Sequence, residues 1–295
     1  QGQAPAFAEV PPVQRSLRQV FLKGVGLGQR LRLMGTALRR VLREVFTAGS
    51  GLALPAPAEA APTAVSITRV QGDLLDRTLR AARAHGATAH SLFLWAIARA
   101  RRSWLGGAPG DHPLRINDLA TLRPFADRDL GDAFDVIVAP HQITVDPTWD
   151  DQTALSTLSA RIRAQKAGGI LPELYRLGLY GQLARVLPTT ATAGLVFKYV
   201  SKTDLAVTNP GRVPFQDVLA RFGEVPVDDF VNFPHLLPPA KVVLVFTTFR
   251  GMLRVVALHD PAALPEGAEA TLVRPLLAEL ERLVAELERT APGVA

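Results

Sequence analysis

The spacing of apolar residues divides the chain into short strands and longer helices. Alternation with a period of two predicts strands over 65–70, 114–122 and 205–208, and a hairpin of 241–248 with 252–259. Helical spacing predicts helices over 73–85, 88–104, 150–166, 171–199 (interrupted at Pro188) and 265–289. Segment 134–145 is expected to be a strand broken at Pro140, and 224–233 is strand-like. Long helices mixed with non-adjacent strands predict an α/β fold, a two-layer sandwich with a mixed β-sheet.

Positive charge is concentrated near the N-terminus. Residues 1–50 carry eight Lys and Arg against two Glu, so this segment accounts for the whole net charge of +6. An Ala- and Pro-rich stretch over 50–63 follows and has the composition of a linker. We therefore divide the chain into a basic helical connector with its linker, residues 1–63, and a second unit, residues 64–295.

The basic segment contains an amphipathic helix. Its apolar face consists of Leu31, Met34, Leu38, Val41, Leu42 and Val45, and its other faces carry Arg32, Arg39, Arg40 and Arg43. Such a helix either lies on a membrane or lipid surface or packs on its own domain with the arginines in water, and we favour the second interpretation. Nucleic acid is not expected as a partner, because the basicity belongs to one helix without stacking aromatic residues.

Length and composition exclude several classes of protein. The 295 residues include no Cys and are 48% hydrophobic, which is typical of a globular chain and excludes a disulfide scaffold, a zinc ribbon and a thiol nucleophile. No apolar run approaches the ~20 residues that span a bilayer, and we expect a cytoplasmic protein. The chain begins with Gln1 and no signal-peptide pattern follows, so we expect a processed or partial product.

Catalytic motifs recognisable by spacing are absent from the sequence. It has no Gly-x-Ser-x-Gly, no His-Glu-x-x-His and no P-loop. The six histidines form no ligand pair, so no metal site is expected, and we interpret them as surface, cap or strand-end residues. His141 and His235, which lie beside prolines, are the best candidates for an exception. Asp228 and Asp229 would face opposite ways on a strand, so we interpret them as turn or edge residues.

Four motifs in order give the chain a resemblance to a known superfamily. The segment from His85 to Ala100 resembles the helix that opens the C-terminal lobe of CoA-dependent acyltransferases, which include peptide-synthetase condensation domains and wax ester synthases. The strand ending in Arg123-Pro124 resembles their Arg-Pro strand. Leu130-Gly131-Asp132 resembles their Leu-Gly-Asn step, with Asp132 in place of Asn. Residues 204–213 resemble their Ser-Asn-x-Gly strand, with Thr208, Asn209 and Gly211 on the motif.

The resemblance runs from about Val65 to Leu287 and implies a lobe of the chloramphenicol acetyltransferase type. It implies an enzyme that moves an acyl group from a thioester to an alcohol or amine, with acyl-CoA or a phosphopantetheinyl carrier protein as donor and no bound cofactor. The superfamily's base is the second His of a His-His-x-x-x-Asp-Gly motif in the N-terminal lobe. This sequence has no His-His pair, so the chain resembles a C-terminal lobe that is inactive alone. The missing lobe would be encoded upstream, cut away, or supplied by a partner chain.

The resemblance places Thr208, Asn209 and Gly211 on one wall of the substrate channel. There the Asn209 amide or the Thr208 hydroxyl would donate to a carbonyl or anchor a pantetheine arm. The alternative for Asn209 is a turn before Pro210-Gly211, and we leave both open. For Arg123 we expect a structural role.

A different class of function remains as the alternative to the acyltransferase. If the chain is complete, the missing histidine motif favours a non-catalytic binding module, or a lipid-surface module that uses the basic helix for peripheral membrane contact.

Overall fold

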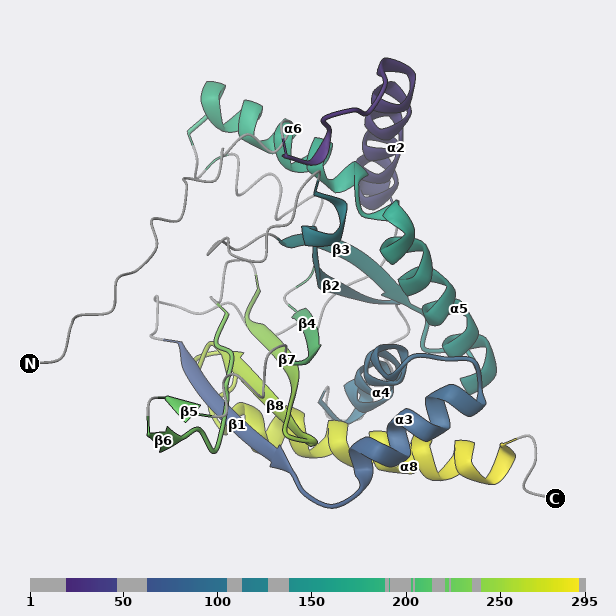
Figure 1. Ribbon diagram of the computed structural model, residues 1–295, viewed down its shortest axis with the longest axis vertical. Helices are drawn as coiled ribbons and strands as arrows, with labels where there is room; N and C mark the ends of the chain where they lie inside the picture. Colours follow the sequence, from purple (N-terminus) through teal and green to yellow (C-terminus); the bar gives the residue numbers. More distant parts are fainter. Residues whose placement is uncertain are drawn as a thin grey trace, which may run out of the picture.

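The computed structural model describes residues 20–46, 63–104, 113–126, 138–188, 191, 203, 205–213, 221–222, 224–234 and 240–291. A six-stranded sheet forms its centre, and helices cover one face of that sheet (Figure 1). The predicted α/β fold, two layers around a mixed sheet, is confirmed.

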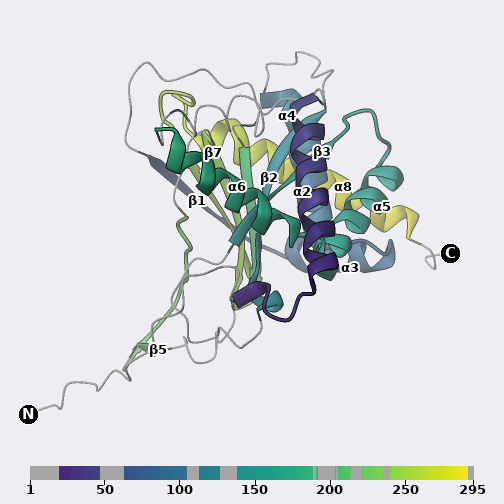
Figure 2. The ribbon, with the colours of Figure 1, turned by 90° about the horizontal axis from the view of Figure 1, so that it is seen from above.

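Parallel and antiparallel neighbours occur together in the sheet. Its strands are β1 (Ala64–Val70), β2 (Leu114–Thr121), β3 (Val138–Val145), β4 (Leu205–Arg212), β7 (Val242–Phe249) and β8 (Met252–His259). They lie in the order β1-β8-β7-β4-β2-β3. β2, β4 and β7 are parallel, and the other neighbours are antiparallel. A short hairpin of β5 (Arg221–Phe222) and β6 (Val225–Pro226) stands away from this sheet (Figure 2).

The helices form one layer and a separate pair. The layer consists of α3 (Leu74–Ala84), α4 (Ala89–Trp104), α5 (Asp151–Ala164) and α8 (Arg274–Thr290). The pair, α2 (Leu27–Phe46) and α6 (Pro172–Val186), lies beyond β3 (Figure 1). A π-helical turn, Gln165–Gly169, joins α5 to α6, and a second one, Glu269–Val273, precedes α8.

α4 is the centre of the hydrophobic core. The apolar run from Leu92 to Ala98 is buried throughout, because the sheet lies on one side of the helix and α8 and α5 lie on others. Phe93 stacks on Phe246 of β7, with 4.4 Å between ring centroids. A helix that is apolar all round needs cover on every side, which is why α4 lies between the sheet and the other helices.

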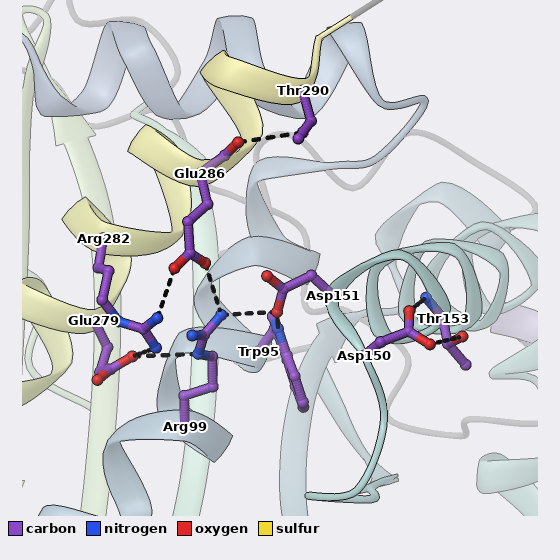
Figure 3. Close-up of polar contacts among 9 residues, drawn as sticks. All are labelled: Trp95, Arg99, Asp150, Asp151, Thr153, Glu279, Arg282, Glu286 and Thr290. Carbon is purple, nitrogen blue, oxygen red and sulfur yellow. Dashed lines mark hydrogen bonds and ion pairs between the residues drawn. The ribbon is translucent and has the colours of Figure 1, made fainter.

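Polar contacts at the rim of α4 hold the helix layer together (Figure 3). Arg99 of α4 contacts Asp151 of α5 at 2.7 Å and Glu286 of α8 at 3.3 Å. The indole N–H of Trp95 donates to the same Asp151 carboxylate at 2.7 Å. At the start of α5, Asp150 caps the helix by accepting from the Thr153 N–H. One arginine thus links three helices.

Two prolines do not end strands where the sequence predicted that they would. Pro140 lies inside β3, and β4 continues through Pro210 to Arg212. β3 is an edge strand, so the missing N–H of Pro140 costs no ladder hydrogen bond. In β4 the register shifts between Thr208 and Gly211, and this bulge accommodates Pro210. By contrast, α6 ends at Val186, two residues before Pro188, and its predicted continuation over 192–199 lies outside the described residues.

Segment 224–233 pairs as a strand only at Val225–Pro226, and then runs over the sheet face that carries no helices. There Asp229 accepts a hydrogen bond from Arg69 of β1 at 2.8 Å and pairs with Arg254 of β8. Arg69 and Arg254 are opposite each other in the β1–β8 ladder. Two like charges in that position repel, and the Asp229 carboxylate neutralises the repulsion. Asp229 therefore fixes the segment to the sheet.

Buried charges join α2 to α6. Glu44 of α2 accepts from Arg176 of α6 at 2.8 Å, and Arg40 of α2 donates to Glu173 of α6 at 2.9 Å. Burial raises the pKa of Glu44, whereas Arg176, His141 and Arg40 hold the pKa of Glu173 below its ordinary value in spite of burial. α2 thus packs on its own chain, as the favoured interpretation expected. The predicted boundary at 63/64 adjoins residues 47–62, which lie outside the described residues.

The face of α2 that packs is not the predicted apolar face. Ala37 and Glu44 are buried against α6, but a stripe of large apolar side chains along the helix is at least half exposed: Leu27, Leu31, Met34, Leu38, Leu42 and Phe46. The ion pairs with α6 set the helix rotation, and this rotation leaves the stripe in solvent. Of the helices described, none is long and apolar enough to cross a bilayer.

We expect Asp229→Asn to lower the free energy of unfolding by about 2–3 kcal/mol, since the buried Arg254 loses its charged acceptor. Burial alone would raise the pKa of Asp229, but the hydrogen bond from Arg69 and the charge of Arg254 lower it. Its stabilisation is therefore present above the unfolded-state pKa, about 3.9, and is lost as the pH falls through the lower folded-state pKa. Denaturant unfolding at several pH values measures this.

Asp228→Asn is the matched control, because Asp228 is the exposed neighbour with the same charge. We expect its unfolding to stay within about 0.5 kcal/mol of the parent chain. Equal losses in the two variants, or a loss in Asp229→Asn that persists at the acid end, would contradict the assigned ion pairs.

Candidate functional site at the carboxyl ends of the parallel strands

Three adjacent parallel strands, β2, β4 and β7, end at the same edge of the sheet. β4 lies between the other two, with Thr208 opposite Leu119 of β2 and Val245 of β7. In open sheets of this kind, ligands bind outside the carboxyl ends of the parallel strands. This edge holds Thr208, Asn209 and Gly211, the residues predicted to line the substrate channel.

The residues of β4 itself account for its bulge. Asn209 Oδ1 accepts a hydrogen bond from the Gly211 N–H at 3.0 Å, which closes a short side-chain turn. Gly211 has a φ of 72°, which a residue with a side chain rarely adopts, and Pro210 between them has no N–H to place. The turn predicted as the alternative for Asn209 is therefore present.

That turn does not use the whole Asn209 side chain. Because the Gly211 N–H is a donor, the amide oxygen must face it, so Nδ2 with its two N–H groups lies on the other side of the amide. Among the described residues no hydrogen bond to this Nδ2 is present, and the side chain is partly exposed. Thr208 is also partly exposed; its β4 neighbour Val207 faces the helix layer, so Thr208 faces the helix-free side of the sheet.

Arg123 comes from the neighbouring strand. It begins the 3₁₀ turn Arg123–Phe125 directly after β2, and its N–H donates to Thr121 Oγ1 at 3.2 Å. The chain therefore turns at Arg123-Pro124, where the strand was expected to end. Thr121 is two residues beyond Leu119, the partner of Thr208, so the two strand ends are adjacent. Asp132, the fifth predicted motif residue, lies outside the described residues.

A His–Asp pair next to this edge was not anticipated. His90 of α4 donates from Nε2 to Asp118 Oδ1 of β2 at 2.9 Å, and both side chains are largely buried. His90 Nδ1 is buried without a hydrogen bond in the described structure. The signal in the sequence was that Asp118 continues the alternation of the apolar Leu114 and Ile116, and an acid on such a buried face needs a partner. The pair connects α4 to β2 on the helix side of the sheet, away from the face to which Thr208 points.

The other candidate histidines are dispersed. His141 lies on β3 opposite Asp118, with Nδ1 3.8 Å from Glu173 Oε1, and His235 lies outside the described residues. Asp228 and Asp229 form no acid pair, since Asp229 binds arginines and Asp228 is exposed. Within the described ranges, no group of His, Asp and Glu could hold a metal ion.

No protein-family model and no curated protein matches this sequence, but solved structures do. The nonribosomal peptide synthetase FmoA3 matches over 86% of this chain with a TM-score of 0.59 and 20% identity. The epimerization domain from the third module of tyrocidine synthetase B matches over 87%, with a TM-score of 0.59 and 14% identity. Trichothecene 15-O-acetyltransferase from Fusarium sporotrichioides matches over 90%, with a TM-score of 0.61 and 13% identity.

This chain spans only part of each of those proteins: 25% of the synthetase, 56% of the epimerization-domain chain and 54% of the acetyltransferase. Identities this low establish the fold and nothing finer. The chain has the condensation-domain and CoA-dependent acyltransferase fold.

Proposed function

We propose that this chain is the C-terminal lobe of an acyltransferase, which moves an acyl group from a CoA or carrier-protein thioester to an alcohol or amine. The observation that carries the proposal is the bulge at the end of β4. It holds Asn209 by its oxygen and leaves the amide N–H groups at the carboxyl edge of the parallel strands. The fold supports the transferase class.

The chemistry divides between this lobe and a second one. A base removes the proton of the acceptor hydroxyl or amine, and the freed electron pair attacks the thioester carbonyl. The tetrahedral oxyanion then collapses, the C–S bond breaks, and the thiolate takes up a proton. The sequence contains no adjacent histidines, so the His-His-x-x-x-Asp-Gly base belongs to another lobe, encoded upstream or on a partner chain. The donor is free acyl-CoA or a partner carrier protein, and no resident cofactor takes part.

In this proposal, Asn209 and Thr208 donate hydrogen bonds either to the oxyanion that develops on the thioester carbonyl or to the pantetheine arm of the acyl donor. An amide N–H held by a fixed turn costs little reorganisation when it donates to an oxyanion or to a pantetheine carbonyl. Thr208, one residue earlier, adds a hydroxyl on the helix-free face of the sheet. Arg123, in the adjacent turn after β2, is a positioning residue that holds the strand end.

Asn209→Asp tests the amide directly. The carboxylate keeps the acceptor for the Gly211 N–H but replaces both donors, so we expect a loss of turnover of about 10²–10³-fold with almost no change in melting temperature. Asn209→Ala removes the acceptor as well, so it should lose turnover and also some stability. Thioester consumption, measured in the native protein with its base lobe, gives the rates. Full turnover in Asn209→Asp would remove this amide from the site.

The lobe assignment itself has a direct test. Reading the coding sequence upstream of Gln1, together with the intact mass of the native protein, shows whether a His-His-x-x-x-Asp-Gly segment belongs to the same chain. If it does, replacing its second His with Ala should abolish thioester consumption. If neither the same chain nor a co-purifying partner carries such a motif, the acyltransferase proposal fails.

The exposed stripe of α2 favours a second candidate, peripheral binding to a lipid surface. Six large apolar side chains follow one line along a 20-residue helix, about 30 Å long. Arg32, Arg39 and Arg43 flank this line and are exposed. Apolar residues beside arginines match an anionic bilayer surface, where each Arg near the headgroups contributes about 1 kcal/mol. This role is compatible with the lobe assignment, since it uses another face.

Vesicles containing anionic lipid test the second candidate. We expect the chain to sediment with them at low salt and to be released at high salt, because screening removes the arginine contribution. Met34→Glu combined with Leu38→Glu should abolish sedimentation, whereas Gln29→Glu, an exposed substitution outside the stripe, should reduce it only slightly. Failure to sediment at low salt, or sedimentation of the double variant, would argue against the lipid-surface role.

A further inference from the structure

A cavity of about 450 Å³ lies along the outer edge of β3, between α2 and the end of α5. Four separate segments contribute to its wall. The lining residues are Arg40, Arg43, Glu44, Arg115, His141, Gln142, Thr144, Arg161, Ala164, Gln165 and Gly169. The cavity is thus formed only when α2 packs beside the sheet.

The wall carries more guanidinium groups than carboxylates. In the described part of the chain, Arg40, Arg43, Arg115 and Arg161 line it, and Glu44 is the one carboxylate among the lining residues. Glu173 and Arg176 lie next to the wall and are paired with one another and with Arg40 and Glu44. Among the residues that the structure describes, five positive groups and two negative ones lie in or beside this partly buried space, and this excess favours an anion as occupant.

The positive charges here are held at an electrostatic cost. Arg115 is 1% exposed, and burial lowers the pKa of its guanidinium. Burial lowers the pKa of Arg161 as well, and the neighbouring charge of Arg43 lowers it further. An anion between these groups would offset both the desolvation and the repulsion.

Uncharged donors in the wall point to the same kind of ligand. Gln165, in the π-helical turn after α5, is 5% exposed, and its Nε2 is buried without a hydrogen bond in the described structure. The cavity thus offers the amide N–H groups of Gln165 beside the arginines of its wall.

We propose that this cavity binds a phosphate group, as a phosphate monoester or a pyrophosphate. Arginine matches phosphate through paired N–H donors, and a dianion balances several guanidinium groups where a single carboxylate would not. Volume beyond one phosphate leaves room for the group that carries it. Soluble phosphate esters and phospholipid headgroups share this chemistry, and the second source would place the cavity near the lipid surface proposed for α2.

The phosphate cavity is independent of the strand-end site. Its wall is formed by α2, β2, β3 and the end of α5, and no residue of β4 belongs to it. On β2, Arg115 lies four residues before Leu119, the partner of Thr208, so about 13 Å of strand separate the cavity wall from the strand end that carries Asn209. Either site can therefore fail its test without affecting the other.

Thermal unfolding and calorimetry of the purified chain with pyrophosphate test the proposal. At matched ionic strength, we expect 10 mM pyrophosphate to raise the melting temperature by several degrees over sodium chloride, by mass action on the folded state.

Arg43→Gln should weaken pyrophosphate binding at least fivefold. The matched control is Arg39→Gln, the same charge change one turn away on α2 and outside the cavity. Gln165→Met, with similar volume and no donor, should weaken binding severalfold while the ligand-free melting temperature stays near that of the parent.

Two results would overturn the proposal: no rise above the chloride control, or equal losses in Arg39→Gln and Arg43→Gln, which would indicate non-specific charge attraction. Glycerol phosphate and vesicles with phosphatidic acid then distinguish the two sources of phosphate. If Arg43→Gln weakens glycerol phosphate and the stripe variant of α2 still binds it, the ligand is soluble. If glycerol phosphate does not bind but vesicle binding falls more in Arg43→Gln than in Arg39→Gln, the ligand is the headgroup.

Discussion

The parallel alignment of β2, β4 and β7 is the constraint on which the rest of this structure depends. Parallel neighbours cannot be joined by a tight turn, so the chain must return to the opposite end before the next parallel strand begins. After β2 the antiparallel strand β3 makes this return, and α5 and α6 then precede β4, which places α6 where α2 can pack. The same alignment brings three strand ends to one edge, where Asn209 lies. The covering layer follows, because the apolar face of such a sheet needs helices over it.

Buried charge fixes the part of the chain that hydrophobic patterning leaves undetermined. An amphipathic helix would normally turn its apolar face inward. In α2 the pairs Glu44–Arg176 and Arg40–Glu173 reverse this, since removing one partner from a buried pair leaves an uncompensated charge, at a cost of about 3–5 kcal/mol. The consequence is double: an apolar stripe faces outward, and a cavity rich in arginine forms between α2 and β3. Both additional binding roles proposed for this chain arise from that one helix rotation.

Local signals in the sequence predicted the elements well and the long-range pairs poorly. Helical periodicity located α3, α4, α5 and α8, and alternation located β1, β2 and the β7–β8 hairpin, because these patterns depend only on near neighbours. The strand break predicted at Pro140 and the strand end predicted before Pro210 were wrong, because whether a strand tolerates proline depends on its place in the sheet. The contacts of Asp229 with Arg69 and Arg254, and of His90 with Asp118, join residues far apart in sequence. The strand order, with the packing of α4 and of segment 224–233 on the two faces of the sheet, brings these groups together.

At the candidate site, the two roles predicted as alternatives for Asn209, a turn residue and a hydrogen-bond donor to substrate, are compatible with one another. A turn that consumed the whole side chain would leave nothing for a substrate, and a free side chain would have to be ordered when the substrate bound. Here the oxygen is engaged by the Gly211 N–H, so the amide plane is fixed before any ligand arrives. A preorganised donor is worth more in a transition state than a mobile one, since its orientation costs nothing at that moment. The turn residues of β4 therefore supply the geometry on which the proposed catalytic role of Asn209 depends.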